Sequence, residues 1–187
     1  MTELNILYLH GFGSRFDPES NKIKSLSKLG EITPFTYDYT QSPNKIIETI
    51  KTVIYRDKID LIVGTSLGGW YAAECGAQLH IPFVALNPLV FPKSLNKYIG
   101  PGIDHYGQEF DLKESVVKEY WDMRGEGIGY ILVELDDDII DPTSIDKITH
   151  NFELLRLYGG NHRFTSLEKC IPLIEGWYGK TLCTGVI

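Results

Sequence analysis

Short apolar runs alternate along the chain with longer segments in which apolar residues return every three or four positions. The short runs are typical of buried strands, and the three-to-four spacing is typical of helices that bury one face. Strands are predicted over residues 5–9, 32–37, 59–63, 82–86, 130–135 and 152–157. Helices are predicted over residues 17–30, 43–54, 67–75 and 166–177, the first with Asp17 as its N-cap and Pro18 at its first position. The alternation predicts an α/β fold, a three-layer α/β/α arrangement around a mainly parallel six-stranded sheet.

Residues 88–129 interrupt this alternation after the fourth strand, with many prolines, glycines and aromatic residues. Insertions of this length usually carry a function or move. We expect a short cap-like insertion that faces the substrate within a single domain over residues 1–187; a crossover without a functional role is the alternative. Aromatic side chains give rigid apolar surface next to a polar reaction centre. Four residues of the insertion are therefore candidates for the substrate wall, unless they only seal the insertion onto the sheet: Phe91, Tyr106, Tyr120 and Trp121.

The junction after the third predicted strand carries the most specific motif of the chain. Ser66 lies there within Gly-Thr-Ser-Leu-Gly, between the buried run 61–63 and the helix that follows. A Gly-x-Ser-x-Gly between a strand and a helix is typical of a nucleophile elbow, in which a strained serine is exposed and the glycines let strand and helix approach closely. The pattern alone arises by chance in roughly a few per cent of chains of this length. Its position between strand and helix is what predicts a nucleophile.

A serine nucleophile needs a base within hydrogen-bond reach and a third group that orients the base. Among the five histidines, His162 directly follows the last predicted strand, so it lies at the same carboxyl edge of the sheet as Ser66. The acid is expected after the fifth strand, where Asp136, Asp137 and Asp138 follow one another. Neighbouring side chains of an extended segment alternate in direction, so the three carboxylates cannot all face the imidazole. The chain order serine, aspartate, histidine is that of α/β hydrolases.

Acyl transfer through a serine also needs two N–H donors for the oxyanion of the tetrahedral intermediate. Leu67, the residue after the serine, supplies one of them. The other is expected from the loop after the first strand, where the N–H of Phe12 is the natural donor. If the second and third strands flank the first, the loops after strands one and three border the crevice in which open α/β sheets bind ligands.

Composition excludes several classes of function. The formal net charge of −7 argues against nucleic acid as a partner, because its phosphates would be repelled. Cys75, Cys170 and Cys183 stand far apart without a Cys-x-x-Cys pair, which indicates a reducing, cytoplasmic setting. No apolar run approaches the length of a membrane span, and the N-terminus lacks the basic start and apolar stretch of a signal peptide.

Several motifs together resemble the small bacterial YqiA-type esterases of the α/β-hydrolase superfamily, namely ILYLHGFGS, IVGTSLGGWYAA, ALNPLVFP, DDIID and YGGNHRF in that order. The resemblance covers nearly the whole chain and includes the step Asn87-Pro88. It implies an α/β-hydrolase fold and a serine esterase that cleaves short-chain acyl esters or thioesters without a metal or cofactor. It also implies that Ser66 is the nucleophile, His162 the base and Asp137 the acid. The family usually has glycine before that aspartate, where this chain has Asp136.

Two other interpretations of the motifs remain open at this point. The same triad could serve a peptidase or an acyltransferase, because a triad does not specify its leaving group. The chain could instead be a partner-binding protein that keeps a hydrolase scaffold. Labelling of Ser66 by a fluorophosphonate would separate an enzyme from such a binding protein.

Overall fold

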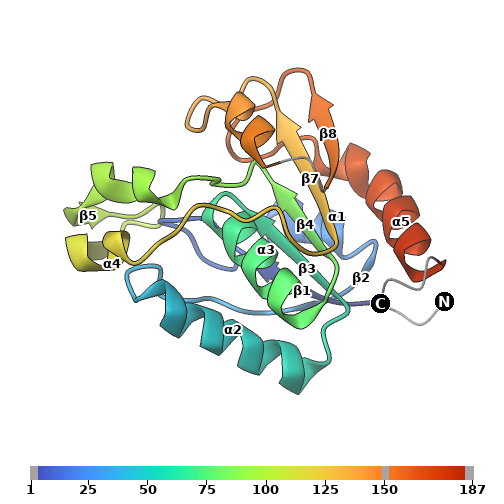
Figure 1. The fold of residues 1–187 in the computed structure, drawn as a ribbon, viewed down its shortest axis with the longest axis horizontal. Coiled ribbons are helices and arrows are strands. Elements are labelled where there is room, and N and C mark those ends of the chain that lie inside the picture. Colours follow the sequence, from blue (N-terminus) through green and yellow to red (C-terminus); the bar gives the residue numbers. More distant parts are fainter. Residues whose placement is uncertain (1–3, 149–151, 184–187) are drawn as a thin grey trace.

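The computed structural model describes residues 4–148 and 152–183, so parts of the expected domain 1–187 lie outside the description. A parallel sheet forms the middle layer, and helices cover both of its faces (Figure 1). Its strands are β1 (Leu4–Leu9), β2 (Gly30–Thr33), β3 (Leu61–Thr65), β4 (Phe83–Leu86), β7 (Gly129–Glu134) and β8 (Glu153–Leu157). All six predicted strands are therefore present, and every neighbouring pair among them is parallel.

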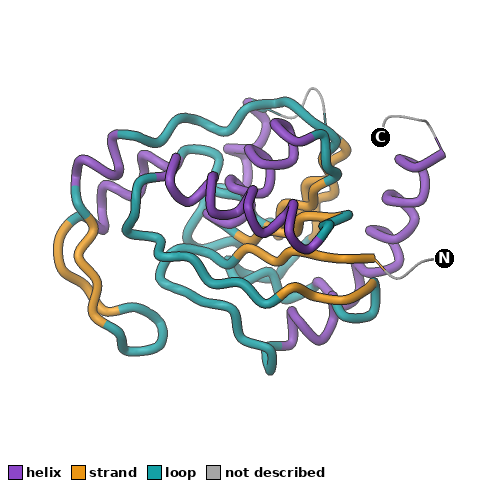
Figure 2. Tube along the Cα trace, turned by 90° about the horizontal axis from the view of Figure 1, so that it is seen from below, coloured by secondary structure: helices purple, strands orange, loops and turns teal. Residues whose placement is uncertain are grey.

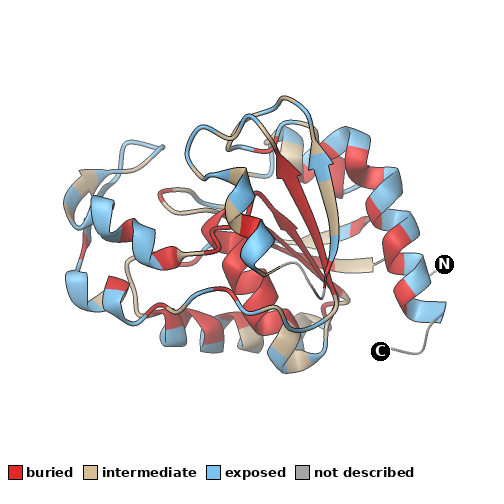
Figure 3. Ribbon diagram, turned by 45° about the horizontal axis from the view of Figure 1, so that its top comes forward, coloured by how far each residue is buried: buried red, intermediate tan, exposed pale blue. Residues whose placement is uncertain are grey.

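The helices divide between the two faces of the sheet. The longer ones are α2 (Pro43–Asp57), α3 (Leu67–Leu79) and α5 (Leu167–Cys183), and the short α1 is Asn21–Leu26. Apolar side chains of α2 and α3 share one core with the sheet, and those of α1 and α5 share the other. Buried residues accordingly fill the central strands and the inward faces of these helices (Figure 3).

Each strand directs alternate side chains to the two cores, as the pleat of a strand requires. In β1, Leu7 and Leu9 pack against the α2 and α3 side, whereas Ile6 and Tyr8 pack against the α1 and α5 side. A strand buried on both faces must be apolar at nearly every position, which explains the continuous apolar runs of the sequence. Each fully buried Leu or Ile stabilises the fold by about 1.5–3 kcal/mol.

The strand order across the sheet is β2-β1-β3-β4-β7-β8, so β2 and β3 flank β1 as expected. The chain therefore reverses its direction of travel across the sheet at β1, and the loops after β1 and β3 lie next to each other. Leu9 pairs with Gly64, which brings the end of β1 beside the last residues of β3. Open α/β sheets bind ligands outside the carboxyl ends of the strands at such a reversal.

The insertion between β4 and β7 contains a hairpin that the sequence pattern did not predict. Its elements are the 3₁₀ helix η1 (Pro92–Tyr98), the antiparallel strands β5 (Gly100–Ile103) and β6 (Glu109–Leu112), and the helix α4 (Glu114–Lys118). Figure 2 shows the hairpin extending away from the main sheet. Near its tip, the N–H of His105 donates a hydrogen bond of 3.0 Å to the carbonyl of Gly13. The insertion thus reaches the loop after β1.

The first helix and the second strand were predicted with the wrong bounds. The first helix does not start at Asp17 and Pro18; it starts at Asn21, with Ser20 as the N-cap, because the hydroxyl of Ser20 accepts a hydrogen bond from the N–H of Ile23. It also ends at Leu26, before the predicted end at residue 30. The second strand covers Gly30–Thr33 and not residues 32–37, since the next residue is Pro34, which has no N–H to donate to a ladder.

Candidate active site

Ser66 occupies a strained turn between β3 and α3. Its φ is +56°, a left-handed backbone conformation that costs a residue with a side chain about 1–3 kcal/mol. The glycines on either side are required by packing: a Cβ on Gly64 would lie 2.0 Å from the carbonyl oxygen of Gly68, and a Cβ on Gly68 would lie 2.0 Å from that of Leu9. The predicted elbow is therefore present, with Ser66 only 8% exposed at its apex.

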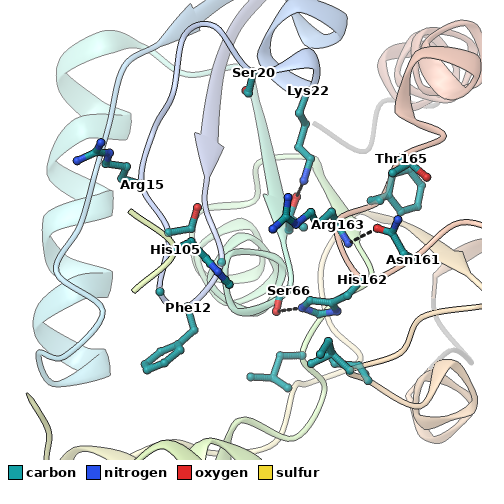
Figure 4. A pocket seen from close by; sticks show the side chains of 18 of the residues that line it. Phe12, Arg15, Ser20, Lys22, Ser66, His105, Asn161, His162, Arg163 and Thr165 are labelled. Carbon is teal, nitrogen blue, oxygen red and sulfur yellow. Dashed lines mark hydrogen bonds between the residues drawn. The ribbon is translucent and has the colours of Figure 1, made fainter. Parts of the chain in front are cut away.

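The structure brings Ser66, His162 and Asp137 into one row of hydrogen bonds. The hydroxyl oxygen of Ser66 lies 3.0 Å from Nε2 of His162, the contact drawn in Figure 4. On the other side of the ring, Nδ1 of His162 lies 2.9 Å and 3.1 Å from the two carboxylate oxygens of Asp137. With the proton of the neutral imidazole on Nδ1, Nε2 is free to accept the proton of the serine hydroxyl.

Asp137 is the aspartate of the three that faces the imidazole. Its Oδ1 also accepts hydrogen bonds from the N–H groups of Ile139 (2.9 Å) and Ile140 (2.8 Å). Burial raises the pKa of Asp137, but the hydrogen bonds from His162 and from these two N–H groups outweigh it and lower the pKa overall. Asp136 and Asp138 are exposed, and Asp138 only accepts a long hydrogen bond of 3.4 Å from the backbone N–H of His162.

The loop that carries His162 is held by a buried carboxylate that sequence reasoning missed. Glu134 ends β7 and is fully buried. Its oxygens accept hydrogen bonds from the backbone N–H groups of Asn161 (2.8 Å), Thr165 (3.1 Å) and Ser166 (2.7 Å). Although burial alone raises the pKa of Glu134, these N–H donors lower it overall, so the carboxylate is ionised near neutral pH. In the sequence, Glu134 stands at the head of a run of acidic residues, and nothing distinguishes it from a solvated charge.

Asn87 connects the same loop to β4 and β7. Its side-chain oxygen accepts a hydrogen bond of 2.7 Å from the N–H of Glu134, and its amide donates one of 2.9 Å to the carbonyl of Asn161. The backbone of Asn87 has a φ of +43°, a conformation that asparagine tolerates better than most residues. The step Asn87-Pro88 entered the sequence analysis only through the resemblance, and the structure gives this asparagine a positioning role.

Another buried polar residue, His10, holds the loop after β1. Nδ1 of His10 donates to the carbonyl of Gly11 at 2.9 Å, and Nε2 accepts from the N–H of Tyr37 at 3.2 Å. Burial lowers the pKa of His10 to about 4, so the ring is neutral at neutral pH. A Cβ on Gly11 would lie 3.3 Å from Cβ of Ser66, so this loop passes directly over the serine. The expected oxyanion donor, Phe12, is the next residue.

Ser66 lines an open cavity of about 1490 Å³. His162 and Phe12 line it, as do Phe91 and Tyr106 from the expected substrate wall. The other two wall candidates do not, and that part of the prediction was wrong.

Tyr120 and Trp121 lie against α3 instead. The hydroxyls of Tyr120 and Tyr71 are 2.7 Å apart, and the carbonyl of Trp121 accepts a hydrogen bond of 3.0 Å from the indole of Trp70. They seal the insertion onto the helix, which is the alternative that the sequence left open.

Neither a metal cluster nor a membrane span occurs in the part of the chain that the structure describes. No group of three or more His, Cys, Asp or Glu side chains there could hold a metal ion. Within the same residues, no helix is both long and apolar enough to cross a membrane.

Comparison with known sequences places the chain in a family. The sequence pattern of UPF0227, described as an uncharacterised protein family, matches residues 5–177. The chain belongs to the UPF0227 family. It is 23% identical to a UPF0227 protein of Shewanella woodyi over 179 residues, which cover 92% of this chain and 98% of the relative. It is also 23% identical to the UPF0227 protein YcfP of Escherichia coli over 183 residues, which cover 95% of this chain and 99% of the relative.

Solved structures with the same fold are α/β hydrolases. Est1E from Butyrivibrio proteoclasticus superimposes with a TM-score of 0.73 at 16% identity, over 96% of this UPF0227 chain and 88% of Est1E. The monoacylglycerol lipase of Paleococcus ferrophilus gives 0.70 at 15% identity, over 94% of each chain. These likenesses confirm the predicted α/β-hydrolase fold.

Proposed function

We propose that this UPF0227 protein is a serine hydrolase that cleaves short-chain acyl esters or thioesters of small molecules. The observation that carries the proposal is the unbroken row of hydrogen bonds from Asp137 through His162 to Ser66, with Ser66 on a strained elbow beside an open cavity. Nucleophile, base and orienting acid in this geometry are the components of acyl transfer through a serine. No cofactor takes part in the reaction.

The reaction proceeds in two steps. First, Oγ of Ser66 attacks the carbonyl carbon while Nε2 of His162 takes the hydroxyl proton, and Asp137 stabilises the imidazolium. The imidazolium then protonates the leaving alcohol or thiol as its bond to the carbonyl carbon breaks, which leaves an acyl-serine. In the second step, water loses its proton to His162 and attacks the acyl-serine, and the acid product departs as Ser66 regains its proton.

Two backbone donors stabilise the oxyanion of each tetrahedral intermediate in this proposal. Leu67 is the first residue of α3, so its N–H has no acceptor inside the helix and lies at the positive end of the helix dipole. Phe12 supplies the second N–H from the loop that His10 holds over Ser66. Removal of one such donor typically lowers kcat by about 10²–10³-fold.

Solved proteins with the same fold support this reaction. Est1E is described with bound ferulic acid, and others are described as an esterase domain from Rhodothermus marinus and as a monoacylglycerol lipase. The three cysteines are free, which suits action in the reducing cytoplasm.

The test is active-site labelling combined with a substrate panel. A fluorophosphonate should label the wild-type protein stoichiometrically at Ser66, and Ser66→Ala should abolish both labelling and the hydrolysis of p-nitrophenyl esters, with a loss of roughly 10³-fold or more. Ser94→Ala is the matched control, because Ser94 lines the same cavity. A thioester and a peptide series in the same panel separates an esterase from a peptidase. If the fluorophosphonate does not label the wild-type protein and the protein hydrolyses no ester, thioester or peptide of the panel, the result would support a partner-binding protein instead.

A further inference from the structure

Positively charged side chains gather on one side of the cavity, although the whole chain carries a formal net charge of −7. Four lie on or near α1 and the loop after β8: Lys22, Lys24, Lys28 and Arg163. Two of them are neutralised by neighbouring carboxylates. Lys24 pairs with Glu19 at 2.9 Å, and Lys28 pairs with Glu168 at 2.6 Å.

Lys22 and Arg163 are different, because neither forms an ion pair with a carboxylate among residues 4–148 and 152–183. Lys22 is half-buried, and Arg163 is exposed to the cavity. Figure 4 shows both side chains extending into the part of the cavity that borders Ser66 and His162. A local concentration of positive charge in a cleft attracts anions even when the whole protein is acidic.

The Lys22 ammonium and the backbone of Arg163 are both held close to the reacting groups. The ammonium of Lys22 donates a hydrogen bond of 3.1 Å to the hydroxyl of Thr65, which is buried and directly precedes Ser66. Arg163 directly follows His162, and its backbone N–H donates to the side chain of Asn161 at 2.9 Å. Adjacent Cα atoms are about 3.8 Å apart, so an anion on these two side chains would lie within one small molecule's length of the serine hydroxyl.

The other side of Ser66 is apolar. In Figure 4 the ring of Phe12 lies on the opposite side of Ser66 from Lys22 and Arg163. Phe12 packs there against the rings of Tyr98 and Phe110, which also line the cavity. A ligand that spans the serine would therefore place an apolar end on the aromatic rings and a charged end on the two cations.

We propose that Lys22 and Arg163 bind an anionic group, a carboxylate or a phosphate, of the ester that Ser66 attacks. The inference rests on the hydrolase function proposed above and specifies its substrate class. The ammonium of Lys22 and the guanidinium of Arg163 provide several N–H donors for the oxygens of such a group. Lys22 and Arg163 contribute to substrate binding and take no part in bond cleavage.

Two matched pairs of substrates test the proposal. The first is p-nitrophenyl pentanoate against mono-p-nitrophenyl glutarate, in which the acyl part of the same length ends in a carboxylate. The second is 1-butyrylglycerol against 1-butyrylglycerol 3-phosphate, in which the alcohol part carries the charge. For at least one pair, kcat/KM of the charged ester should exceed that of the neutral one by roughly tenfold, the effect of one charge-assisted hydrogen bond. The pair that shows the preference identifies the part of the ester that carries the anion.

Variants separate recognition from a structural role of Lys22. Lys22→Met and Arg163→Met should each lower the charged-to-neutral ratio of kcat/KM by roughly tenfold, whereas Lys22→Arg should restore most of the ratio. Lys24→Met is the matched control and should leave the ratio unchanged, since Lys24 is already paired with Glu19. If Lys22 only positioned Thr65, Lys22→Met would lower kcat/KM of the charged and of the neutral ester in proportion. The charged-to-neutral ratio would then stay constant, which would overturn the proposal.

A measurement on the wild-type protein needs no variant. Raising the ionic strength from about 0.01 M to 0.5 M should lower kcat/KM for the preferred charged ester and leave that of its neutral partner unchanged, because salt screens the attraction. Hydrolysis of all four esters without preference for charge would refute the anion site alone. Protein that hydrolyses none of them and is not labelled by a fluorophosphonate would refute the hydrolase function itself.

Discussion

Glu134→Gln should weaken both the fold and the reaction while leaving every proposed reacting group in place. The carboxylate of Glu134 accepts three backbone N–H groups of the loop that carries His162, and one of its oxygens accepts two of them, from Asn161 and Thr165. The amide of glutamine must replace one oxygen by a donor. The less damaging orientation leaves the N–H of Ser166 without its acceptor.

The expected magnitude follows from these contacts. A buried N–H that loses its partner costs about 1–3 kcal/mol, and each of the two remaining hydrogen bonds loses the share that came from the charge, about 1 kcal/mol. Glu134→Gln should therefore lower the free energy of unfolding by roughly 3–5 kcal/mol. A loop displaced by about 1 Å misplaces the base, so kcat/KM should also fall by roughly 10²-fold in protein that is still folded.

Urea unfolding at pH 7 measures the first effect, and the rates of ester hydrolysis and fluorophosphonate labelling measure the second. Glu153→Gln is the matched control, because Glu153 is exposed on the neighbouring strand β8. The pKa of Glu134 is lowered in the folded state, so its contribution is present above the unfolded pKa of 4.5 and is lost as the pH falls below it. The difference in the free energy of unfolding between wild type and Glu134→Gln should therefore become smaller at acid pH. A variant that unfolds within 0.5 kcal/mol of wild type, roughly the scatter of surface changes, and labels at its rate would refute this role.

Three further predictions concern residues around the same site. Asp137→Asn should lower turnover by roughly 10³–10⁴-fold, while the same change at Asp136 or Asp138 should cost less than about tenfold; a crippled Asp138→Asn with an active Asp137→Asn would show that the acid is misassigned. The pKa of His10 is about 4, below its unfolded value of 6.5, so the stability that neutral His10 contributes is present above pH 6.5 and is lost as the pH falls toward 4. In urea titrations, the free energy of unfolding of the wild type should therefore fall by about 2 kcal/mol between pH 7 and pH 5, and that of His10→Gln should not show this fall. Trp121→Ala should lower the free energy of unfolding by about 3 kcal/mol without changing the preference for acyl-chain length, and a changed preference at unchanged stability would return Trp121 to the substrate wall.

The strands of the main sheet could be predicted because a strand that is buried on both faces requires apolar residues at nearly every position. The run Leu61-Ile62-Val63 is fully buried, and its apolar character is visible without a structure. The hairpin Gly100–Leu112 could not be predicted in the same way. Its strands are short, Leu112 is their only buried residue, and two glycines and a proline occur in the first of them, so no alternating apolar pattern marks the hairpin.

The proposed reacting residues could be located because each follows a predicted strand, and parallel strands end at one edge of a sheet. Ser66, Asp137 and His162 were found by that placement together with the resemblance. Tyr120 and Trp121 were assigned wrongly because aromatic residues in an insertion can face either a cavity or a helix. The sequence does not distinguish the two, since an apolar ring is buried in both environments.

The accuracy of the site depends on where β3, β7 and β8 end, and β4 lies between β3 and β7 in the same sheet. The register aligns Thr65 with Leu86 and Glu134 with Leu157, so the loops that carry the proposed nucleophile, acid and base leave the sheet at fixed offsets from one another. The strand register sets where each loop leaves the sheet, but it does not set the positions of side chains farther along the loop. A neutral His10 and an ionised Glu134 then hold the loops beyond the strand ends, and neither is among the reacting groups. Substitutions at these two polar residues should therefore alter reaction rates in a chain that still folds, whereas substitutions of the apolar strand residues should alter stability first.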